Sequence, residues 1–452
     1  MLIAGALAAL GVAAIAVETA DGAGPSAAPA APAAPAAPPA AHHWPQWRGP
    51  LATGVAPHAE PPLEWSEERN VRWKIPLPGR GHSTPIVWAD RVFLTAAIPR
   101  GEPVRPAAER PGAHDNAQLT HRHEFLVLAV GRRDGRILWR RTVHEAVPEE
   151  AGHATASLAS HSPVTDGEWL FASFGSHGLY ALDLDGDLKW KADLGPMRTK
   201  HGHGEGASPA LDGDTLIVNW DHEGPSFLVA FDKRTGRERW RAARDEPSSW
   251  ATPIVVEQGE GAQVVVSGTN RLRGYDFQGG KVIWELGGLS HNVVASPVAG
   301  GGMVFAGSSY EKQALLAVRL DGAEGDLAGT DRVAWTRGHG TPYVPSPLLY
   351  DGALYFLRHY QGILTRVEAS TGRDLPGTFR LPGIGNVYAS PVAAAGRVYV
   401  TGLDGTTVVL SAGDRPEVLA VNRLDEPIDA SPALVGRQMF LRGARHVYCV
   451  EE

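Results

Sequence analysis

The residues best suited to chemistry in this chain stand in five short polar clusters. The first two are HGHGEG at residues 201–206 and WDHEG at residues 220–224, where histidines adjoin or alternate with carboxylates. Imidazole and carboxylate ligands suit zinc, copper or nickel, and a histidine beside an acid can also serve in acid–base catalysis. The other three clusters, TNRLR, SSYEK and RHYQG at residues 269–273, 308–312 and 358–362, add cations and tyrosines that could hold a polar or anionic ligand.

Each cluster also has a purely structural interpretation. An H-x-H pair on a glycine-rich loop, such as His201 and His203, is common without a metal, so we assign no metal ligands. The run at 220–224 could be a hydrogen-bonded loop, and Glu311 with Lys312 could be an ion pair. The sequence has no nucleophile elbow, phosphate-binding loop or helix-borne zinc motif, and we therefore leave catalytic residues unassigned.

A repeated unit predicts the elements that position these clusters. Alternating apolar residues, a Gly hairpin and a Trp follow in most units, as in FLVAFDKRTGRERW from Phe227. Four short strands in roughly 44 residues are typical of one blade in a radial array. The sequence therefore predicts an all-β fold, an eight-bladed β-propeller of four-stranded blades. The unit begins with a Ser/Thr–Pro pair that recurs eight times, with prolines at 85, 163, 209, 253, 297, 347, 391 and 432.

The eighth unit has three strands where the others have four. The segment NVRWKIPL, Asn70–Leu77, offers the missing strand, with Trp73 in the place of the repeat Trp. We therefore predict that this N-terminal strand closes the ring in the last blade and removes its exposed edges. The repeat tryptophans should pack between blades, because large aromatic side chains bury extensive surface there.

Alternating strand direction divides the loops between two faces of the ring. The loop before each Ser/Thr–Pro strand and the loop between the second and third strands share one face, and the Gly hairpins share the other. All five polar clusters fall on the first face, and so does an insertion, residues 97–122, which we predict to be a polar surface loop. The predicted ligand-binding residues are His201, His203, Glu205, Asp221, His222, Glu223, Arg271, Tyr310, Glu311, Lys312 and His359. We expect neighbouring carboxylates to raise the pKa of these histidines, with pH-sensitive binding between about pH 5 and 8.

The N-terminal segment has a different composition. Residues 2–17 are an uninterrupted apolar run, shorter than the roughly 20 residues of a spanning helix. We predict a signal peptide or membrane anchor over 1–23, an Ala/Pro-rich linker over 24–41 and the propeller over 42–452. The protein should be exported to the periplasm or cell envelope, with membrane contact only through this N-terminal segment.

Charge and cysteine content exclude several classes of function. The formal net charge is −8, which argues against nucleic acid as a partner because no basic excess is available to neutralise phosphates. Cys449 is the single cysteine, so an intrachain disulfide and a multi-cysteine metal site are excluded.

The repeat resembles the quinoprotein-like β-propeller family, whose unit is Ser/Thr-Pro, strand, Gly, strand, then Leu-x-Ala-Leu-Asp-x-x-Thr-Gly-x-x-x-Trp. The resemblance runs from about Trp44 to Glu452, and the opening WPQWRGP is similar to the lead-in of BamB-like envelope members. For the enzymes of the family it implies pyrroloquinoline quinone (PQQ) with calcium at the ring centre. This chain departs from those enzymes, because it lacks the adjacent-cysteine disulfide and a Cys-x-x-Cys-His cytochrome motif.

We therefore predict an exported, non-enzymatic binding or scaffold protein of the bacterial cell envelope. A protein, a peptide, or a polar or anionic ligand would bind at the polar mouth of the ring. The alternative is a PQQ- or metal-dependent oxidoreductase, and a hydrolase or lyase using the histidine cluster is a third hypothesis.

Overall fold

The computed structural model describes residues 39–106, 110–259, 261–377 and 379–452. The predicted signal peptide or anchor, residues 1–23, lies outside these ranges, as does all but the end of the predicted linker, residues 24–41. None of the helices in the described ranges has the length and apolar content of a membrane span. Those helices are the short 3-10 turns η1 (Pro39–His42), η2 (Gly175–His177) and η3 (Lys200–Gly202).

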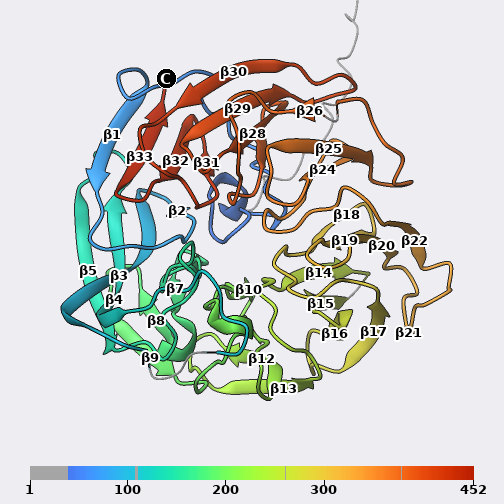
Figure 1. Cartoon of the computed structure of the whole chain (residues 1–452), viewed down its shortest axis with the longest axis horizontal. Helices are drawn as coiled ribbons and strands as arrows, with labels where there is room; N and C mark the ends of the chain where they lie inside the picture. The colour runs from blue at the N-terminus through green and yellow to red at the C-terminus, as the bar shows by residue number, and fades with distance from the viewer. Residues whose placement is uncertain (1–38, 107–109, 260, 378) are drawn as a thin grey trace, which may run out of the picture. The chain divides into compact units, whose positions relative to one another are not determined.

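The described strands form eight sheets arranged around a centre, so the prediction of an eight-bladed propeller is confirmed (Figure 1). The first blade contains β2 (Ile86–Trp88), β3 (Arg91–Val104), β4 (Thr120–Gly131) and β5 (Ile137–Ala146). The second contains β6 (Val164–Thr165), β7 (Trp169–Ser173), β8 (Leu179–Asp183) and β9 (Leu188–Ala192). The third contains β10 (Ala210–Asp212), β11 (Thr215–Trp220), β12 (Ser226–Asp232) and β13 (Glu238–Arg244). The fourth contains β14 (Ile254–Gln258), β15 (Gly261–Ser267), β16 (Arg271–Asp276) and β17 (Val282–Gly287).

The second half of the ring repeats this order. The fifth blade contains β18 (Val298–Gly300), β19 (Met303–Ser308), β20 (Ala314–Arg319) and β22 (Val333–Arg337). The short β21 (Gly325–Asp326) leaves that blade and pairs in parallel with β17 of the fourth. The sixth contains β23 (Leu348–Tyr350), β24 (Ala353–Leu357), β25 (Ile363–Glu368) and β26 (Phe379–Arg380). The seventh contains β27 (Val392–Ala394), β28 (Arg397–Thr401), β29 (Thr406–Ser411) and β30 (Val418–Arg423). The eighth contains β31 (Ala433–Val435), β32 (Gln438–Arg442), β33 (His446–Glu451) and β1 (Val71–Pro76).

The pairing of β1 with β33 closes the ring, as predicted. The two strands are antiparallel, and Trp73 lies opposite Cys449. The Trp73 indole Nε1 donates to the Arg132 carbonyl of the first blade at 3.0 Å. The indole ring packs against Gly135 (φ +73°). A Cβ atom built onto this glycine would be only 2.9 Å from the ring. The last blade is thus joined to the first through the N-terminal strand.

The same contact recurs around the ring and supports a packing role for the repeat tryptophans. Each indole donates to a backbone carbonyl of the next blade at 2.8–3.0 Å and lies against a turn glycine with positive φ. Trp284 differs, because its Nε1 donates to Gln263 within its own blade at 2.6 Å. The tryptophans that make the inter-blade contact are Trp73, Trp139, Trp190, Trp240 and Trp335.

The Ser or Thr of each Ser/Thr–Pro pair takes part in a hydrogen-bonded ring at the inner edge of the blades. In seven links of 2.8–3.0 Å, the backbone N–H of one such residue donates to the hydroxyl of its counterpart in the next blade. The Thr84 hydroxyl is buried without a partner at the junction of the eighth and first blades. We call these residues the ring hydroxyls: Thr84, Ser162, Ser208, Thr252, Ser296, Ser346, Ser390 and Ser431.

Replacing one ring hydroxyl should destabilise the fold measurably. In Ser296→Ala, the buried N–H of Thr252 loses the acceptor that it now has at 2.8 Å. An unsatisfied buried donor costs about 1–3 kcal/mol, so urea unfolding should show a loss in that range. Ser296→Thr keeps the hydroxyl and is the matched control. Equal stability of the Ala variant and the wild-type chain would contradict this role for the ring.

The lead-in to the first blade crosses the channel of the ring. Trp44 is fully buried and exchanges backbone hydrogen bonds with Val87 of the first blade. On the other side, the Arg48 guanidinium donates to the carbonyls of Pro391 and Pro347 at 2.7 and 3.0 Å. Burial lowers the pKa of Arg48 to about 9. Figure 1 shows this segment as a dark blue loop at the centre of the ring.

Candidate functional site

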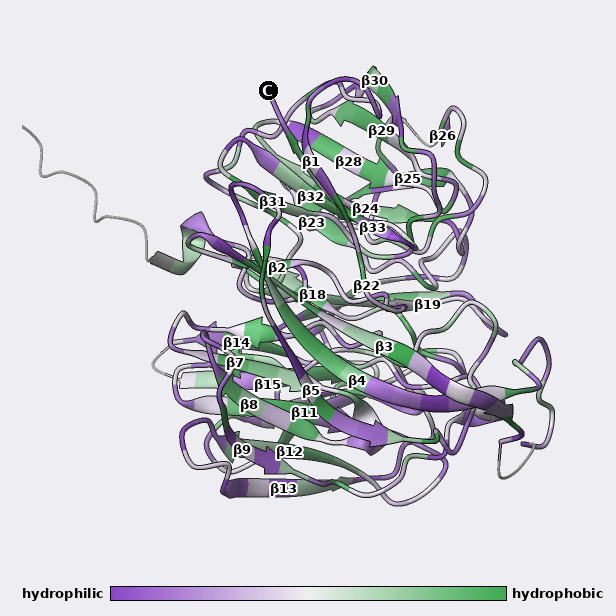
Figure 2. Ribbon diagram, turned by 90° about the vertical axis from the view of Figure 1, so that its left-hand side faces the viewer, coloured by the Kyte–Doolittle hydropathy of each residue, from purple (hydrophilic) through white to green (hydrophobic). Residues whose placement is uncertain are grey.

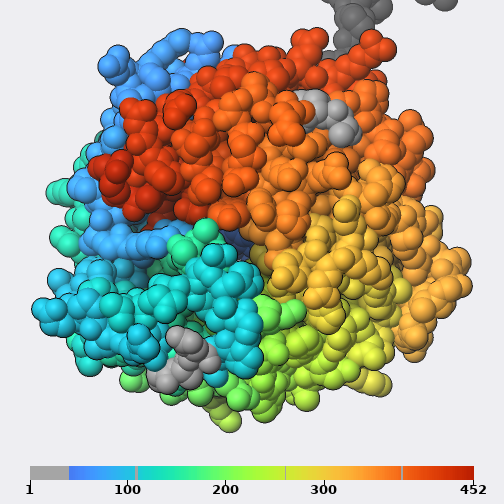
Figure 3. Space-filling view, in the orientation of Figure 1, coloured from blue at the N-terminus to red at the C-terminus, as the bar shows by residue number. Residues whose placement is uncertain are grey.

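A cavity of about 540 Å³ opens on the face that carries the loops before each Ser/Thr–Pro strand, here called the mouth face. Figure 3 shows the hollow near the centre of this face. Trp47, from the lead-in that crosses the channel, belongs to the lining, so this segment forms part of the wall of the cavity.

One position of the repeat supplies the lining from every blade. The residue two places before each ring hydroxyl lines the cavity, which means that all eight blades converge on it. Sequence reasoning missed this position, although aligning the eight units on their prolines would have displayed it. The residues are His82, Ser160, Gly206, Trp250, Val294, Val344, Tyr388 and Asp429.

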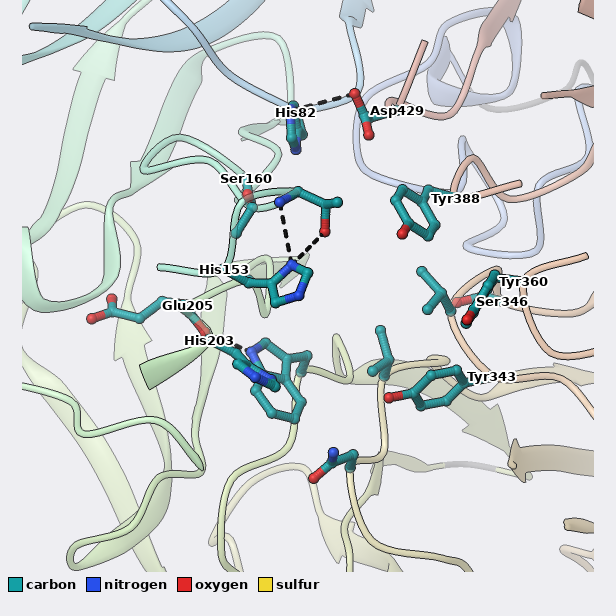
Figure 4. A pocket seen from close by; sticks show the side chains of 18 of the residues that line it. His82, His153, Ser160, His203, Glu205, Tyr343, Ser346, Tyr360, Tyr388 and Asp429 are labelled. Carbon is teal, nitrogen blue, oxygen red and sulfur yellow. Dashed lines mark hydrogen bonds and ion pairs between the residues drawn. The ribbon is translucent and has the colours of Figure 1, made fainter. Parts of the chain in front are cut away.

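Histidines dominate one side of the cavity (Figure 4). The His203 ring centroid lies 4.8 Å from that of His114 and 5.1 Å from that of His153. Near them His82 Nε2 lies 3.5 Å from the Asp429 carboxylate. Desolvation raises the pKa of Asp429 to about 6, although Arg80 opposes the shift.

Tyrosines form the opposite side, as Figure 4 shows for Tyr343, Tyr360 and Tyr388. Tyr343 stacks on His359 with ring centroids 4.6 Å apart, and His359 lies 4.4 Å from Tyr360. Tyr310 also stacks on Tyr343, with ring centroids 5.9 Å apart. This row presents aromatic edges and hydroxyls to a ligand, a lining typical of sites that orient polar or amphipathic groups.

The repeats of this chain match a known protein family. The family model of outer membrane protein assembly factor BamB matches residues 123–376, more than half of the chain. The chain belongs to the BamB-like β-propeller family. No curated protein sequence matches it.

Solved structures agree with this BamB-like fold. BamB from Moraxella catarrhalis superposes with a TM-score of 0.56 at 15% identity, covering 84% of this chain and 99% of that one. A quinohemoprotein alcohol dehydrogenase from Pseudomonas putida HK5 gives 0.55 at 12%, covering 91% and 80%. The computationally designed protein Ika8 gives 0.51 at 10%, covering 78% and 100%. At these identities the similarity shows the fold alone.

Four of the predicted ligand-binding residues line the cavity of the BamB-like propeller. They are His203, Glu205, Tyr310 and His359. Glu205 accepts the Ser176 backbone N–H at 2.7 Å, and desolvation raises the pKa of its carboxyl to about 7. His201 is outside the lining, with its ring centroid 5.4 Å from that of His203.

The cluster at 220–224 lies away from the cavity. The Asp221 carboxylate accepts both Arg244 Nε and Nη2, at 2.7 and 2.9 Å, and both side chains are fully buried. His222 Nδ1 accepts the backbone N–H of Arg198 at 3.1 Å, and Glu223 accepts that of Ser248 at 3.1 Å. In the structure these three side chains hold loops together.

The predicted cationic residues also lie off the cavity. Arg271 pairs with Asp245 at 2.7 Å, and its Nε lies 3.4 Å from Glu285. Glu311 is exposed and lies 3.5 Å from His291, and Lys312 is likewise exposed at the surface. None of the described residues that line the cavity is Lys or Arg.

The expectation that carboxylates raise the pKa of the mouth histidines was wrong. Burial lowers the pKa of His82 to about 3 and that of His203 to about 4, and neighbouring cationic or imidazole groups add to the shift. Desolvation also lowers the pKa values of His153, His222 and His359. Because removal from water disfavours the charged imidazolium more than nearby carboxylates favour it, these histidines are neutral near pH 7.

The insertion also differs from the predicted surface loop. Residues 97–104 and 120–122 are strand, because β3 and β4 continue pairing as far as Val104 and Thr120. Figure 2 shows the two strands as one long ribbon whose far ends are hydrophilic. The connection between them brings His114 and Asp115 into the lining of the cavity.

The lining does not fit the cofactor that the enzymes of the wider family use. PQQ carries three carboxylates, and the described lining supplies no Lys or Arg to pair with them. Calcium takes six to eight oxygen ligands. The carboxylates that line the cavity, Asp115, Glu205 and Asp429, come from separate loops.

Proposed function

We propose that this BamB-like propeller is a non-enzymatic binding or scaffold protein of the bacterial cell envelope, and that a segment of a partner protein occupies the mouth cavity. The observation that carries the proposal is the convergence of one repeat position from all eight blades on a single pocket. Its volume of about 540 Å³ suits a few side chains or the end of a polypeptide. The family description, an outer membrane assembly factor, supports a protein partner and an envelope location.

The charge of the lining favours a basic or neutral partner segment over an acidic one. Asp429, with its pKa raised to about 6, is largely ionised at pH 7. The histidines beside it are neutral at that pH, because their pKa values are lowered. Arg271 and Lys312, which suggested an anionic ligand, lie outside the cavity. A Lys or Arg of the partner would therefore meet a carboxylate and tyrosine rings.

Photocrosslinking in cells tests this proposal. The full chain would carry benzoylphenylalanine in place of Tyr343 or Tyr388 at the mouth, or of the exposed Lys281 in a Gly hairpin on the opposite face. We expect adducts with one envelope protein from the two mouth positions, through a segment that contains Lys or Arg. Adducts only from Lys281, adducts from none of the three positions, or crosslinking to an acidic segment would contradict it.

Substitutions in the lining should weaken binding without unfolding the ring. For Tyr343→Ala combined with Asp429→Asn, we expect the Kd for the crosslinked peptide to rise at least about tenfold, since each change removes one group of the lining. The melting temperature should fall by only a few degrees, because both side chains line the cavity and neither belongs to the buried core. Fluorescence anisotropy measures the Kd, and Lys281→Ala is the control. An unchanged Kd in the double variant would place the partner elsewhere.

A further inference from the structure

Three separate loops bring four imidazoles together beside the mouth cavity, and all but His201 line it. His114 comes from the insertion between β3 and β4, His153 from the loop between β5 and β6, and His201 and His203 from the loop between β9 and β10. The His203 ring centroid lies 4.8, 5.1 and 5.4 Å from those of His114, His153 and His201. His114 and His201 are 5.6 Å apart.

Hydrogen bonds between the loops hold the cluster in place. The side-chain amide of Asn116, in the insertion, donates to the His201 carbonyl at 2.8 Å. The backbone N–H of Ala154 donates to the Asp115 carbonyl at 2.8 Å, and that of His153 donates to the His203 carbonyl at 3.2 Å. Each loop is thereby fixed to the other two.

Backbone contacts set which nitrogen carries the proton in two of these imidazoles. His114 Nδ1 lies 3.0 Å from the Gly112 carbonyl, and His201 Nδ1 lies 3.0 Å from the Pro111 carbonyl. A carbonyl can only accept, so these Nδ1 atoms carry the proton and the Nε2 atoms keep a free lone pair. Metal-binding histidines commonly make this same contact through their second nitrogen. His203 Nε2 is buried and has no hydrogen-bond partner.

The backbone at His201 is also unusual. Its φ is +57°, in the left-handed region, which non-glycine residues seldom occupy and which costs of order 1 kcal/mol or more. The interloop bonds hold His201 in this conformation and turn its ring toward His114 and His203. Strain of this kind is typical of residues that a functional site constrains.

Ring spacing decides what the cluster can bind. With Zn–N distances near 2.0–2.1 Å and tetrahedral angles, imidazoles that share one ion have centroids about 5 Å apart. The observed separations of 4.8, 5.4 and 5.6 Å among His114, His201 and His203 match this value. As the side chains now stand, no three His, Cys, Asp or Glu residues in the described ranges are placed to hold a metal ion, so binding requires these rings to turn about their side-chain torsions.

We propose that His114, His201 and His203 bind one divalent transition-metal ion, Zn²⁺, Cu²⁺ or Ni²⁺. Neutral imidazoles suit these ions and not Mg²⁺ or Ca²⁺. The site goes beyond the proposed function, because metal binding needs no partner protein. It also gives the insertion a role, since only the insertion supplies His114.

Calorimetry on the purified full chain tests the site. After treatment with EDTA, titration with Zn²⁺, Cu²⁺ and Ni²⁺ should give one bound equivalent for at least one ion, while Mg²⁺ gives no binding. The triple variant His114→Ala/His201→Ala/His203→Ala should weaken that binding at least about 100-fold. His121→Ala/His123→Ala, which removes another H-x-H pair, from the start of β4, is the matched control and should bind as the wild type does.

A single variant keeps the test decisive if the triple variant does not fold. His114 is exposed, and its side chain makes one backbone hydrogen bond, so His114→Ala should fold normally and bind the ion at least about tenfold more weakly. Absence of binding to all three ions by the wild-type chain would overturn the proposal. Wild-type affinity in His114→Ala, or loss of binding in the control, would also overturn it.

Discussion

Deletion of residues 1–77 is expected to open the ring and cost at least about 5 kcal/mol of stability, the largest loss of any change considered. The deletion removes β1 and leaves the edge of β33 unpaired. It also removes Trp73 and the lead-in residues Trp44 and Arg48, which pack inside the ring. Loss of one large buried aromatic side chain alone costs about 3–5 kcal/mol. Thermal unfolding followed by circular dichroism measures the effect.

Deletion of residues 1–41 is the matched control. The backbone hydrogen bonds between Trp44 and Val87 remain in this variant, and so does the pairing of β1 with β33. Its melting temperature should therefore equal that of the full chain. If the longer deletion also melts at that temperature, the ring does not depend on closure by β1.

Asp221→Ala should destabilise the fold by about 3–5 kcal/mol, because it leaves the fully buried Arg244 guanidinium without its carboxylate. The Ser249 hydroxyl, which donates to Asp221 at 2.6 Å, also loses its acceptor. Urea unfolding of the purified variant measures the loss. Asp221→Leu combined with Arg244→Met removes both charges and should recover much of it.

Glu311→Ala is the comparison for Asp221→Ala, because both residues were predicted to bind the ligand but only Asp221 is buried in an ion pair. Glu311 is exposed, and its nearest ionic neighbour is His291 at 3.5 Å, so stability should change by less than about 0.5 kcal/mol. If Asp221→Ala is as stable as the wild type but fails to bind the partner segment, Asp221 belongs to the binding site.

The periodic features of the fold could be predicted because each arises from local chemistry that repeats. The Ser/Thr–Pro pairs gave the number of blades, since each supplies a hydroxyl to the ring and each proline carries no N–H. The closing strand could be identified because the eighth unit has only three strands and the N-terminal segment carries Trp73 in the place of the repeat Trp. Strand alternation placed His203 and Tyr310 on the correct face. The prediction failed for the pKa values of the mouth histidines, which depend on burial and on neighbours that are distant in sequence.

By itself the sequence determined the propeller, its closure and the face that carries the polar loops. Only the tertiary structure decided which polar side chains meet there. Asp221 lies next in sequence to His222, yet its partner is Arg244 on the outermost strand of the same blade, so it is buried in an ion pair. His114 stands 87 positions before His201 (201 − 114), yet the long ribbon of β3 and β4 brings their rings to 5.6 Å. Strand and turn propensities act over a few residues, whereas a site in a ring is assembled from loops of different blades, and its members are fixed only when the ring closes.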